Sequence, residues 1–153
     1  MGDVFPAILT ERGVSISVGV FVPGAQTGFL PTINFLIDTG ASITNINEIE
    51  AEKFGIDSDS LRRSSKPVMT CGGTAQAFVI DRPVILLPNK AGAPKEFPDL
   101  PVIHLLKRPI KKSRKGEKEI EIQIPNLLGR DFFIAHRLRL VVDYRTNTAF
   151  IED

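Results

Sequence analysis

The sequence has few of the residues that build several common kinds of site. It contains one cysteine, two histidines and no tryptophan among 153 residues. The single cysteine, Cys71, excludes an intrachain disulfide and favours a reducing, cytoplasmic compartment. His104, His136 and one cysteine are too few and wrongly spaced for a zinc site. We therefore expect neither a metal nor a cofactor, and we interpret both histidines as ordinary surface or edge residues.

An excess of charge and long hydrophobic runs are also missing. The chain has 19 basic and 18 acidic residues, for a formal net charge of +1, so no overall field attracts nucleic acid or an anionic membrane. No apolar run approaches membrane-spanning length, and residues 1–6 do not resemble a signal peptide. The basic stretch 107–118 lacks interleaved aromatics and is interpreted as a solvated loop. We expect no nucleic-acid or membrane partner.

The residues that are abundant favour one mainly β domain over residues 1–153. Hydrophobic residues make up 42% of the chain, and 12 glycines and 11 prolines punctuate it. Strict alternation predicts a half-buried strand over 13–22, and an apolar run predicts another over 29–37. Short helices are expected after Asn47, which can cap a helix that ends near Gly55, and over 131–136.

Further strands and turns are expected along the rest of the chain. Gly72 and Gly73 predict a hairpin that joins 68–71 to 76–80. Strands are also expected over 83–88, 102–106 and 120–124, and a closing hairpin over 138–151. The prolines between 88 and 101 favour a loop in that segment.

One short motif carries chemistry. Asp38 directly follows the apolar run Phe35-Leu36-Ile37 and is followed by Thr39, Gly40, Ala41 and Ser42. A carboxylate at the end of a buried strand is unusual, because burying a lone charge is costly. A strand that ends in an ordinary Asp-Thr-Gly turn is the simpler alternative, since chance gives the triplet in about one chain in thirty of this length.

A second segment far downstream strengthens the interpretation. Leu127-Leu128-Gly129-Arg130-Asp131 places two apolar residues before Gly-Arg-Asp, and Phe132-Phe133 follow. Together the two segments resemble the retropepsin-like aspartic proteases, which pair an apolar-Asp-Thr-Gly-Ala/Ser loop with a later apolar-apolar-Gly-Arg-Asp/Asn segment. The resemblance extends over roughly 13–151. It implies a closed acid-protease barrel that is mainly β, with one or two short helices and a flap hairpin.

The resemblance also implies a role for each matching residue. Asp38 would be the catalytic carboxylate, Thr39 would join the two active-site loops across a dimer axis, and Gly40 would support the loop. Ala41 would face the substrate, and Arg130 would brace the loop and the dimer. The hairpin at Cys71, Gly72, Gly73 and Thr74 would be the flap over a polypeptide substrate.

The number of catalytic carboxylates then predicts a second copy of the chain. Hydrolysis of this type needs two adjacent carboxylates, one ionised and one protonated, and aspartic proteases are the standard example of such a pair. No second Asp-Thr-Gly or Asp-Ser-Gly occurs in the chain. We therefore expect a homodimeric aspartic endopeptidase. The alternative is an inactive retropepsin-like domain used for dimerisation or peptide binding, and an unrelated β-barrel binding module ranks below both.

Overall fold

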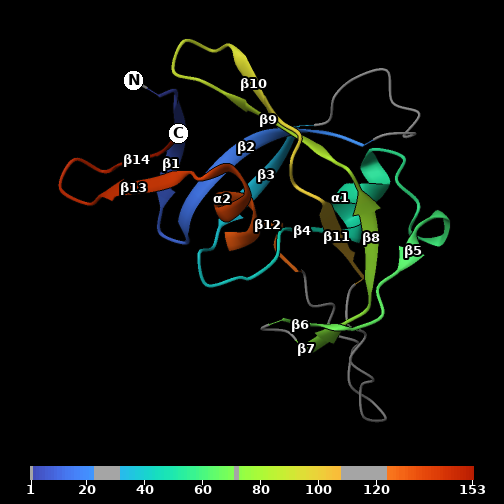
Figure 1. The fold of residues 1–153 in the computed structure, drawn as a ribbon. Helices are drawn as coiled ribbons and strands as arrows, with labels where there is room; N and C mark the ends of the chain where they lie inside the picture. The colour runs from blue at the N-terminus through green and yellow to red at the C-terminus, as the bar shows by residue number, and fades with distance from the viewer. Residues whose placement is uncertain (1, 23–31, 71–72, 108–123) are drawn as a thin grey trace.

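The fold is built almost entirely from strands (Figure 1). The computed structural model describes residues 2–22, 32–70, 73–107 and 124–153. The strands are β1 (Val4–Thr10), β2 (Gly13–Phe21), β3 (Thr32–Ile37), β4 (Asn45–Asn47), β5 (Arg62–Arg63), β6 (Val68–Thr70), β7 (Gly73–Ala75), β8 (Ala77–Asp81), β9 (Val84–Pro88), β10 (Pro94–Phe97), β11 (Val102–Leu106), β12 (Leu127–Leu128), β13 (Arg139–Asp143) and β14 (Thr148–Glu152). The helices are α1 (Glu48–Lys53), the 3₁₀ turn η1 (Ser58–Ser60) and α2 (Arg130–His136).

One large curved sheet contains most of the strands. Its order is β13-β14-β1-β2-β3-β12-β4-β11-β8-β5, and β9 pairs with β2 and carries β10. Only β3 with β12 and β4 with β11 run parallel, and the other pairs are antiparallel. The mainly β prediction is confirmed, but the closed barrel is not. Among the described residues the sheet stays open, because its terminal strands β13 and β5 do not pair with each other.

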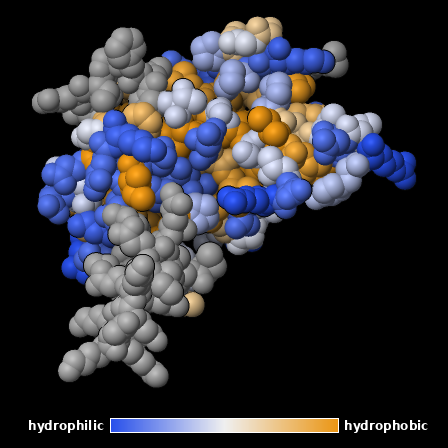
Figure 2. Space-filling model, turned by 180° about the vertical axis from the view of Figure 1, so that it is seen from behind, coloured by the Kyte–Doolittle hydropathy of each residue, from blue (hydrophilic) through white to orange (hydrophobic). Residues whose placement is uncertain are grey.

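Alternating burial explains why β2 lies where the sequence predicts it. Val14, Ile16, Val18 and Val20 are buried and enter the main core, whereas Ser17 and Phe21 are exposed. This is the pattern of a strand with one face on a core. At the surface of the molecule, hydrophobic residues appear between hydrophilic ones (Figure 2).

Both predicted helices are present, and α1 begins at its expected cap. The Asn47 side chain accepts a hydrogen bond from the Glu50 backbone N–H at 2.9 Å, which satisfies one free donor of α1. Gly55, with φ of 71°, follows the end of α1 in a conformation that glycine adopts without strain. Gly129 is the N-cap of α2 and has no side chain to supply a capping bond.

Two local predictions are wrong in part. The strand expected over 76–80 is not the second arm of the glycine hairpin, because β6 pairs with β7 while β8 joins the main sheet beside β11. The segment 88–101 is not a loop throughout, because β10 pairs with β9. Proline is tolerated there because β10 is an edge strand that begins at Pro94. The strand expected over 120–124 falls mostly outside the described residues.

The two ends of the chain lie side by side (Figure 1). β1 pairs with β14 in antiparallel register from Val4 with Glu152 to Ala7 with Ala149. Lys95 on β10 forms ion pairs with Asp3 and Asp153. β13 and β14 form the predicted closing hairpin, so β1, β14 and β13 make a terminal sheet within one chain.

An aromatic cluster joins α2 to the strands beneath it. The His136 ring lies 5.0 Å from both Phe97 and Phe132, centroid to centroid, and Phe97 also contacts Phe5. His136 Nε2 is buried and has no hydrogen-bond partner among the described residues. Burial lowers the pKa of His136, although the nearby Asp99 carboxylate opposes this shift. The cluster therefore favours neutral His136.

We expect this histidine to make the fold sensitive to acid. The pKa of His136 is lower in the folded state than the value of about 6.5 expected in the unfolded chain. The unfolded chain therefore takes up the proton first as the pH falls. The free energy of unfolding should fall as the pH drops below about 6.5. Denaturant unfolding between pH 7.5 and 5 should show a shallower loss in His136→Phe than in the parent. Equal pH dependence in both proteins would contradict the prediction.

No helix among the described residues is long and apolar enough to cross a membrane.

Candidate active site

Asp38 owes its position to a pairing between two distant segments. β12 lies parallel to β3, with Leu127 beside Leu36 and Leu128 beside Ile37. The Asp38 backbone N–H donates to the Leu128 carbonyl at 3.1 Å. Thus the Asp38 segment and the Leu127-Leu128 segment, which the sequence analysis identified, lie side by side. Asp38 lies where the two paired strands end.

The loop after β3 orients the carboxylate of Asp38. The Gly40 backbone N–H donates to Asp38 Oδ1 at 2.9 Å, and a Cβ at position 40 would come within 3.1 Å of that oxygen. The Ala41 N–H donates to the Asp38 carbonyl at 3.1 Å, which closes a tight turn. Thr39 is exposed at the tip of this turn, and its side chain makes no hydrogen bond among the described residues. Asp38 is itself half-buried, so one side of the carboxylate is open.

A buried hydrogen-bond network fastens this loop to the start of α2. Thr44, which is fully buried, donates through Oγ1 to Asp131 Oδ1 at 2.7 Å, and its backbone N–H donates to Asp131 Oδ2 at 3.0 Å. The Gly129 N–H donates back to Thr44 Oγ1 at 3.0 Å. The Arg130 backbone N–H reaches the Ala41 carbonyl at 2.8 Å. Residues 41–44 and 129–131 are therefore joined by four hydrogen bonds.

The bracing contacts within the chain come from Asp131, a residue to which the sequence assigned no role. The Arg130 side chain is exposed and makes no hydrogen bond or ion pair among the described residues. Its predicted brace of the loop is thus limited to its backbone N–H within one chain. The predicted brace of a dimer stays a prediction.

We expect Thr44→Val to destabilise the protein strongly although the shape changes little. The substitution removes the hydroxyl that both donates to Asp131 and accepts from Gly129, and it leaves a buried N–H without a partner. A cost of about 2–4 kcal/mol in the free energy of unfolding is expected. Thr44→Ser keeps the hydroxyl and is the control. Denaturant unfolding that shows equal stability for the two variants would refute this account.

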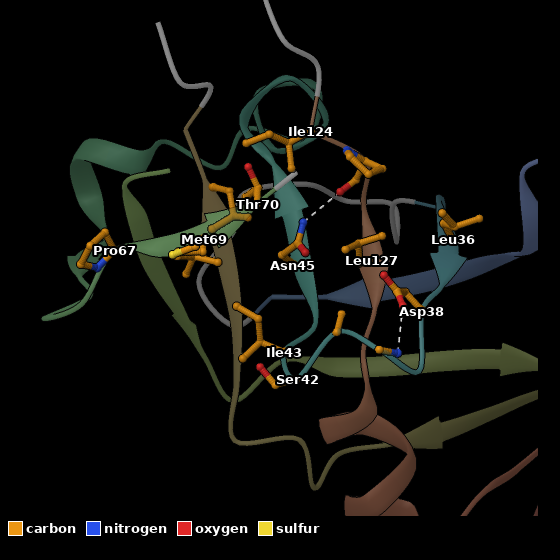
Figure 3. A pocket seen from close by; sticks show the side chains of 15 residues that line it. Leu36, Asp38, Ser42, Ile43, Asn45, Pro67, Met69, Thr70, Ile124 and Leu127 are labelled. Carbon is orange, nitrogen blue, oxygen red and sulfur yellow. Dashed lines mark hydrogen bonds between the residues drawn. The ribbon is translucent and has the colours of Figure 1, made fainter. Parts of the chain in front are cut away.

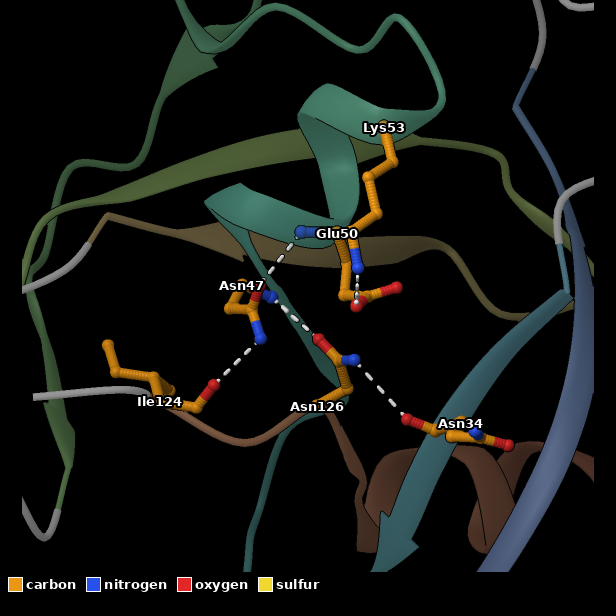
Figure 4. A network of polar contacts seen from close by, with 6 residues as sticks. All are labelled: Asn34, Asn47, Glu50, Lys53, Ile124 and Asn126. Carbon is orange, nitrogen blue, oxygen red and sulfur yellow. Dashed lines mark hydrogen bonds and ion pairs between the residues drawn. The ribbon is translucent and has the colours of Figure 1, made fainter.

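A second network, made by asparagines, includes Ile124, which lines a groove described below (Figure 4). The Asn126 side chain accepts from the Asn47 N–H at 2.8 Å and donates to the Asn34 carbonyl at 3.2 Å. The Asn47 side chain donates to the Ile124 carbonyl at 2.9 Å. These bonds satisfy buried polar groups and tie β3, α1 and the chain before β12 together. Isolated asparagines gave no signal in the sequence that could have predicted this network.

A groove opens beside Asp38 (Figure 3). It has a volume of about 700 Å³, within the range of ligand-binding clefts. Among the described residues, Asp38 is its only charged lining residue, and most of the others are apolar. The lining residues are Leu36, Asp38, Gly40, Ala41, Ser42, Ile43, Asn45, Pro67, Val68, Met69, Thr70, Leu106, Ile124, Pro125 and Leu127.

The hairpin expected as a flap lies on the far side of this groove from Asp38 (Figure 3). Among the described residues, the lining on this side comes from residues 67–70, on and before β6, and the flap role of residues 71–74 stays a prediction. Gly73 and Thr74 are exposed on β7 and do not line the groove. Cys71 and Gly72 lie outside the described residues. The apolar pair Val68-Met69 shortly before the two glycines was the signal that could have identified the lining strand.

His104 lies behind the loop, and the structure gives it no part in the groove. Its backbone N–H donates to the Thr44 carbonyl at 3.1 Å. Its Nδ1 is buried and lacks a partner among the described residues. Burial lowers the pKa of His104, against the opposing effect of Asp131. Within the described part of the chain, no three His, Cys, Asp or Glu side chains are grouped as a metal site would need.

Comparisons with known proteins agree with this geometry. Residues 22–85 match the model of the aspartyl protease family. Among solved structures, a retropepsin-like aspartic protease from Rickettsia conorii is similar over 99% of this chain and 92% of its own, with 17% identity and a TM-score of 0.55. The retroviral protease-like domain of Ddi1 from Leishmania major aligns over 88% of this chain and 85% of its own, with 16% identity and a TM-score of 0.47. No curated protein sequence matches.

The family match includes the Asp38 loop, and the Rickettsia conorii enzyme shares the fold over nearly the whole chain. Residues 22–85 are thus similar to the aspartyl protease family, and the chain has the fold of a retropepsin-like aspartic protease.

Proposed function

We propose that the protein is an aspartic endopeptidase whose active site forms between two copies of the chain. The observation that carries the proposal is the placement of Asp38. Its carboxylate lies at a groove of about 700 Å³ that is otherwise apolar or uncharged, on a loop held by β12 and by the Thr44–Asp131 bonds. A carboxylate fixed beside a cleft of this size is suited to act on a bound polypeptide.

The chemistry needs a second carboxylate within hydrogen-bonding distance of the first. An ionised carboxylate removes a proton from a water molecule, and the oxygen of that water attacks the scissile carbonyl carbon. A protonated carboxylate donates to the carbonyl oxygen, and the resulting tetrahedral intermediate collapses when the amide nitrogen leaves with a proton. Two carboxylates about 3 Å apart do not both ionise, so they share one proton, as the aspartic proteases illustrate.

The groove of one chain supplies only one of these groups. In the part of the chain that the structure describes, no other aspartate or glutamate lines it. A twofold axis beside the Asp38 loop would bring two copies of the residue together and would double the groove. Thr39, exposed at the loop tip, would then face its counterpart. Twofold dimers are the commonest soluble oligomers.

A cleavage assay tests the proposal. We expect hydrolysis of an unfolded protein substrate between about pH 4 and 7, and inhibition by the statine-type inhibitor pepstatin, because catalysis uses one ionised and one protonated carboxylate. Rates per chain should rise with protein concentration until the dimer saturates. If folded, dimeric protein cleaves nothing at any pH or concentration, the proposed enzymatic function is refuted.

Peptide binding without cleavage is the second candidate. It is favoured by one observation, the apolar lining from Leu36, Val68, Met69, Leu106 and Leu127, which would hold apolar side chains whatever the state of Asp38. Fluorescence anisotropy with a labelled apolar peptide measures this binding directly. Binding with no cleavage would select this candidate.

A further inference from the structure

A short segment beside the groove carries an exposed serine that follows two arginines. The segment Arg62-Arg63-Ser64-Ser65-Lys66-Pro67 connects β5 to β6. Arg62 and Arg63 form β5, the terminal strand of the main sheet, which in the described part of the chain pairs only with β8. Both arginines are exposed, and so is Ser65. A hydroxyl with arginines two and three residues before it has a charge pattern that protein kinases with an acidic substrate groove select.

Of the two serines, Ser65 is the one whose hydroxyl is free. The Ser64 Oγ donates to the Lys66 carbonyl at 3.0 Å, and the Ser64 backbone N–H donates to the Ala77 carbonyl at 2.9 Å. Ser64 is also half-buried. The Ser65 side chain makes no hydrogen bond among the described residues, so nothing in this part of the fold competes for its Oγ. Ser65 is therefore the better phosphate acceptor of the two.

The two arginines are accessible and weakly held. The backbone is extended at Leu61 and through β5, which is a form in which a peptide segment lies along another protein. Arg62 makes one ion pair among the described residues, with Asp81 at 3.4 Å, and exposed pairs of this kind contribute little to stability. Arg63 Nε lies 2.9 Å from the Gln76 side-chain oxygen when that amide is oriented to accept. Both guanidinium groups can therefore turn to an acidic partner at small cost.

The same segment continues into the wall of the groove. Ser65 is two residues before Pro67, the first of the lining residues 67–70, and Pro67 lies across the groove from Asp38 (Figure 3). A phosphate on serine adds a charge of about −1.5 to −2 at pH 7. Among the described residues Asp38 is the only charged group that lines the groove, so a phosphate at its rim changes the local potential. Acidic peptides would be repelled and basic peptides attracted.

We propose that Ser65 is a phosphorylation site for a protein kinase that selects arginine two and three residues before the acceptor, and that the phosphate changes which peptides bind the groove. In the transfer, the Ser65 oxygen forms a bond to the γ-phosphorus of ATP as the bond from that phosphorus to the ADP oxygen breaks. The hydroxyl proton passes to a carboxylate of the kinase. The site itself is independent of the proposed function, whereas its effect on the groove rests on that function.

Phosphorylation of the folded protein tests the site. We expect cyclic-AMP-dependent protein kinase, a kinase that selects arginine, to add one phosphoryl group from ATP, which tandem mass spectrometry should locate at Ser65. Ser65→Ala should abolish this addition, and Ser64→Ala should be modified like the parent. Arg62→Ala and Arg63→Ala should each slow it about tenfold or more, because each removes charge-assisted hydrogen bonds to the kinase. Arg145→Ala, in the exposed turn after β13, is the matched control and should be modified at the parent rate.

A second serine provides an internal comparison. Ser113, which lies outside the described residues, follows Lys111 and Lys112 and has no arginine at the two selected positions. Modification at Ser113 in place of Ser65 would overturn the proposed site. So would modification at Ser65 that does not depend on Arg62 and Arg63. A folded protein that takes up no phosphate, while the kinase modifies its standard peptide substrate, would overturn it as well.

Peptide binding tests the effect on the groove. In an Asp38→Asn background, which suppresses cleavage, fluorescence anisotropy at pH 7 compares an acidic and a basic apolar peptide of equal length. Phosphorylation should weaken binding of the acidic peptide and strengthen that of the basic one, by about two- to fivefold at low salt and less at high salt. Equal changes for both peptides, or none, would overturn the effect and leave the site standing. If neither peptide binds the unmodified protein, the proposed function and this effect both fail, and mass spectrometry still decides the site.

Discussion

Asp38→Asn should lower peptide cleavage by at least about 10²–10⁴-fold while the protein stays folded and dimeric. Asparagine keeps an oxygen that can accept the Gly40 N–H, so the loop retains the 2.9 Å bond that orients the side chain. It cannot take a proton from water. The substitution therefore removes the general base and leaves the fold and the loop unchanged. Initial cleavage rates on a quenched fluorescent peptide measure the loss of activity.

Asp81→Asn is the matched control for this substitution. Asp81 makes only an exposed ion pair with Arg62 at 3.4 Å, so the same chemical change should leave cleavage near the parent level. Mixing parent with Asp38→Asn provides a stricter test. Random pairing at equal amounts leaves two intact Asp38 residues in about a quarter of the dimers, so activity should fall well below half. Simple dilution of activity to one half would argue against a shared pair.

Gly129→Ala should have the largest effect on folding among the glycine substitutions at the site. A Cβ at position 129 would lie 2.3 Å from the Ile43 carbonyl oxygen and 2.5 Å from its carbon. Both are backbone atoms of the loop that Asp131 holds, so neither can move without breaking the Thr44 bonds. We expect a loss of about 3 kcal/mol or more in the free energy of unfolding. Cleavage should fall as well.

The control for Gly129→Ala is a glycine that has open space around it. Gly92, in the turn between β9 and β10, has a φ of 86° and no atom within 4 Å of an added Cβ. Gly92→Ala should cost about 1–2 kcal/mol through backbone strain and should leave cleavage unchanged at temperatures where it is folded. Urea unfolding of both variants distinguishes a close approach from conformational strain. A smaller loss at 129 than at 92 would contradict the packing seen here.

These predictions depend on a division of roles between two sequence segments. The first segment supplies the carboxylate that would react, at Asp38. The second supplies the groups that hold it, through Leu128, Gly129 and Asp131. Its glycine is needed because α2 begins against the backbone of the Asp38 loop, where a side chain would collide. The same packing explains why an acidic residue follows Arg130, since Asp131 satisfies two donors of Thr44.

Local features were predictable wherever a residue's own chemistry decided them. The alternation of β2, the Asn47 cap, the closing hairpin and the proximity of Asp38 to the Leu127-Leu128 segment follow from hydrophobic period, capping and the family pattern. The prediction of the hairpin arms failed in part for a physical reason. Two glycines mark a turn, but the length of each arm depends on which neighbour offers a better partner, and β8 found one in β11.

The sequence by itself determined the mainly β fold, the single Asp-Thr-Gly triplet and hence the need for a second copy in any catalytic reading. Only the tertiary structure decided that Asp131 rather than Arg130 provides the side chain that braces the loop within the chain, and that residues 67–70 line the groove. It also showed that β13, β5 and β10 are the edge strands of the described sheet, because an edge exists only once the other strands have their partners. Composition and hydrophobic periodicity determine which element a single segment tends to form. Strand pairing depends on the competition among all segments of the chain, so only the tertiary structure shows it.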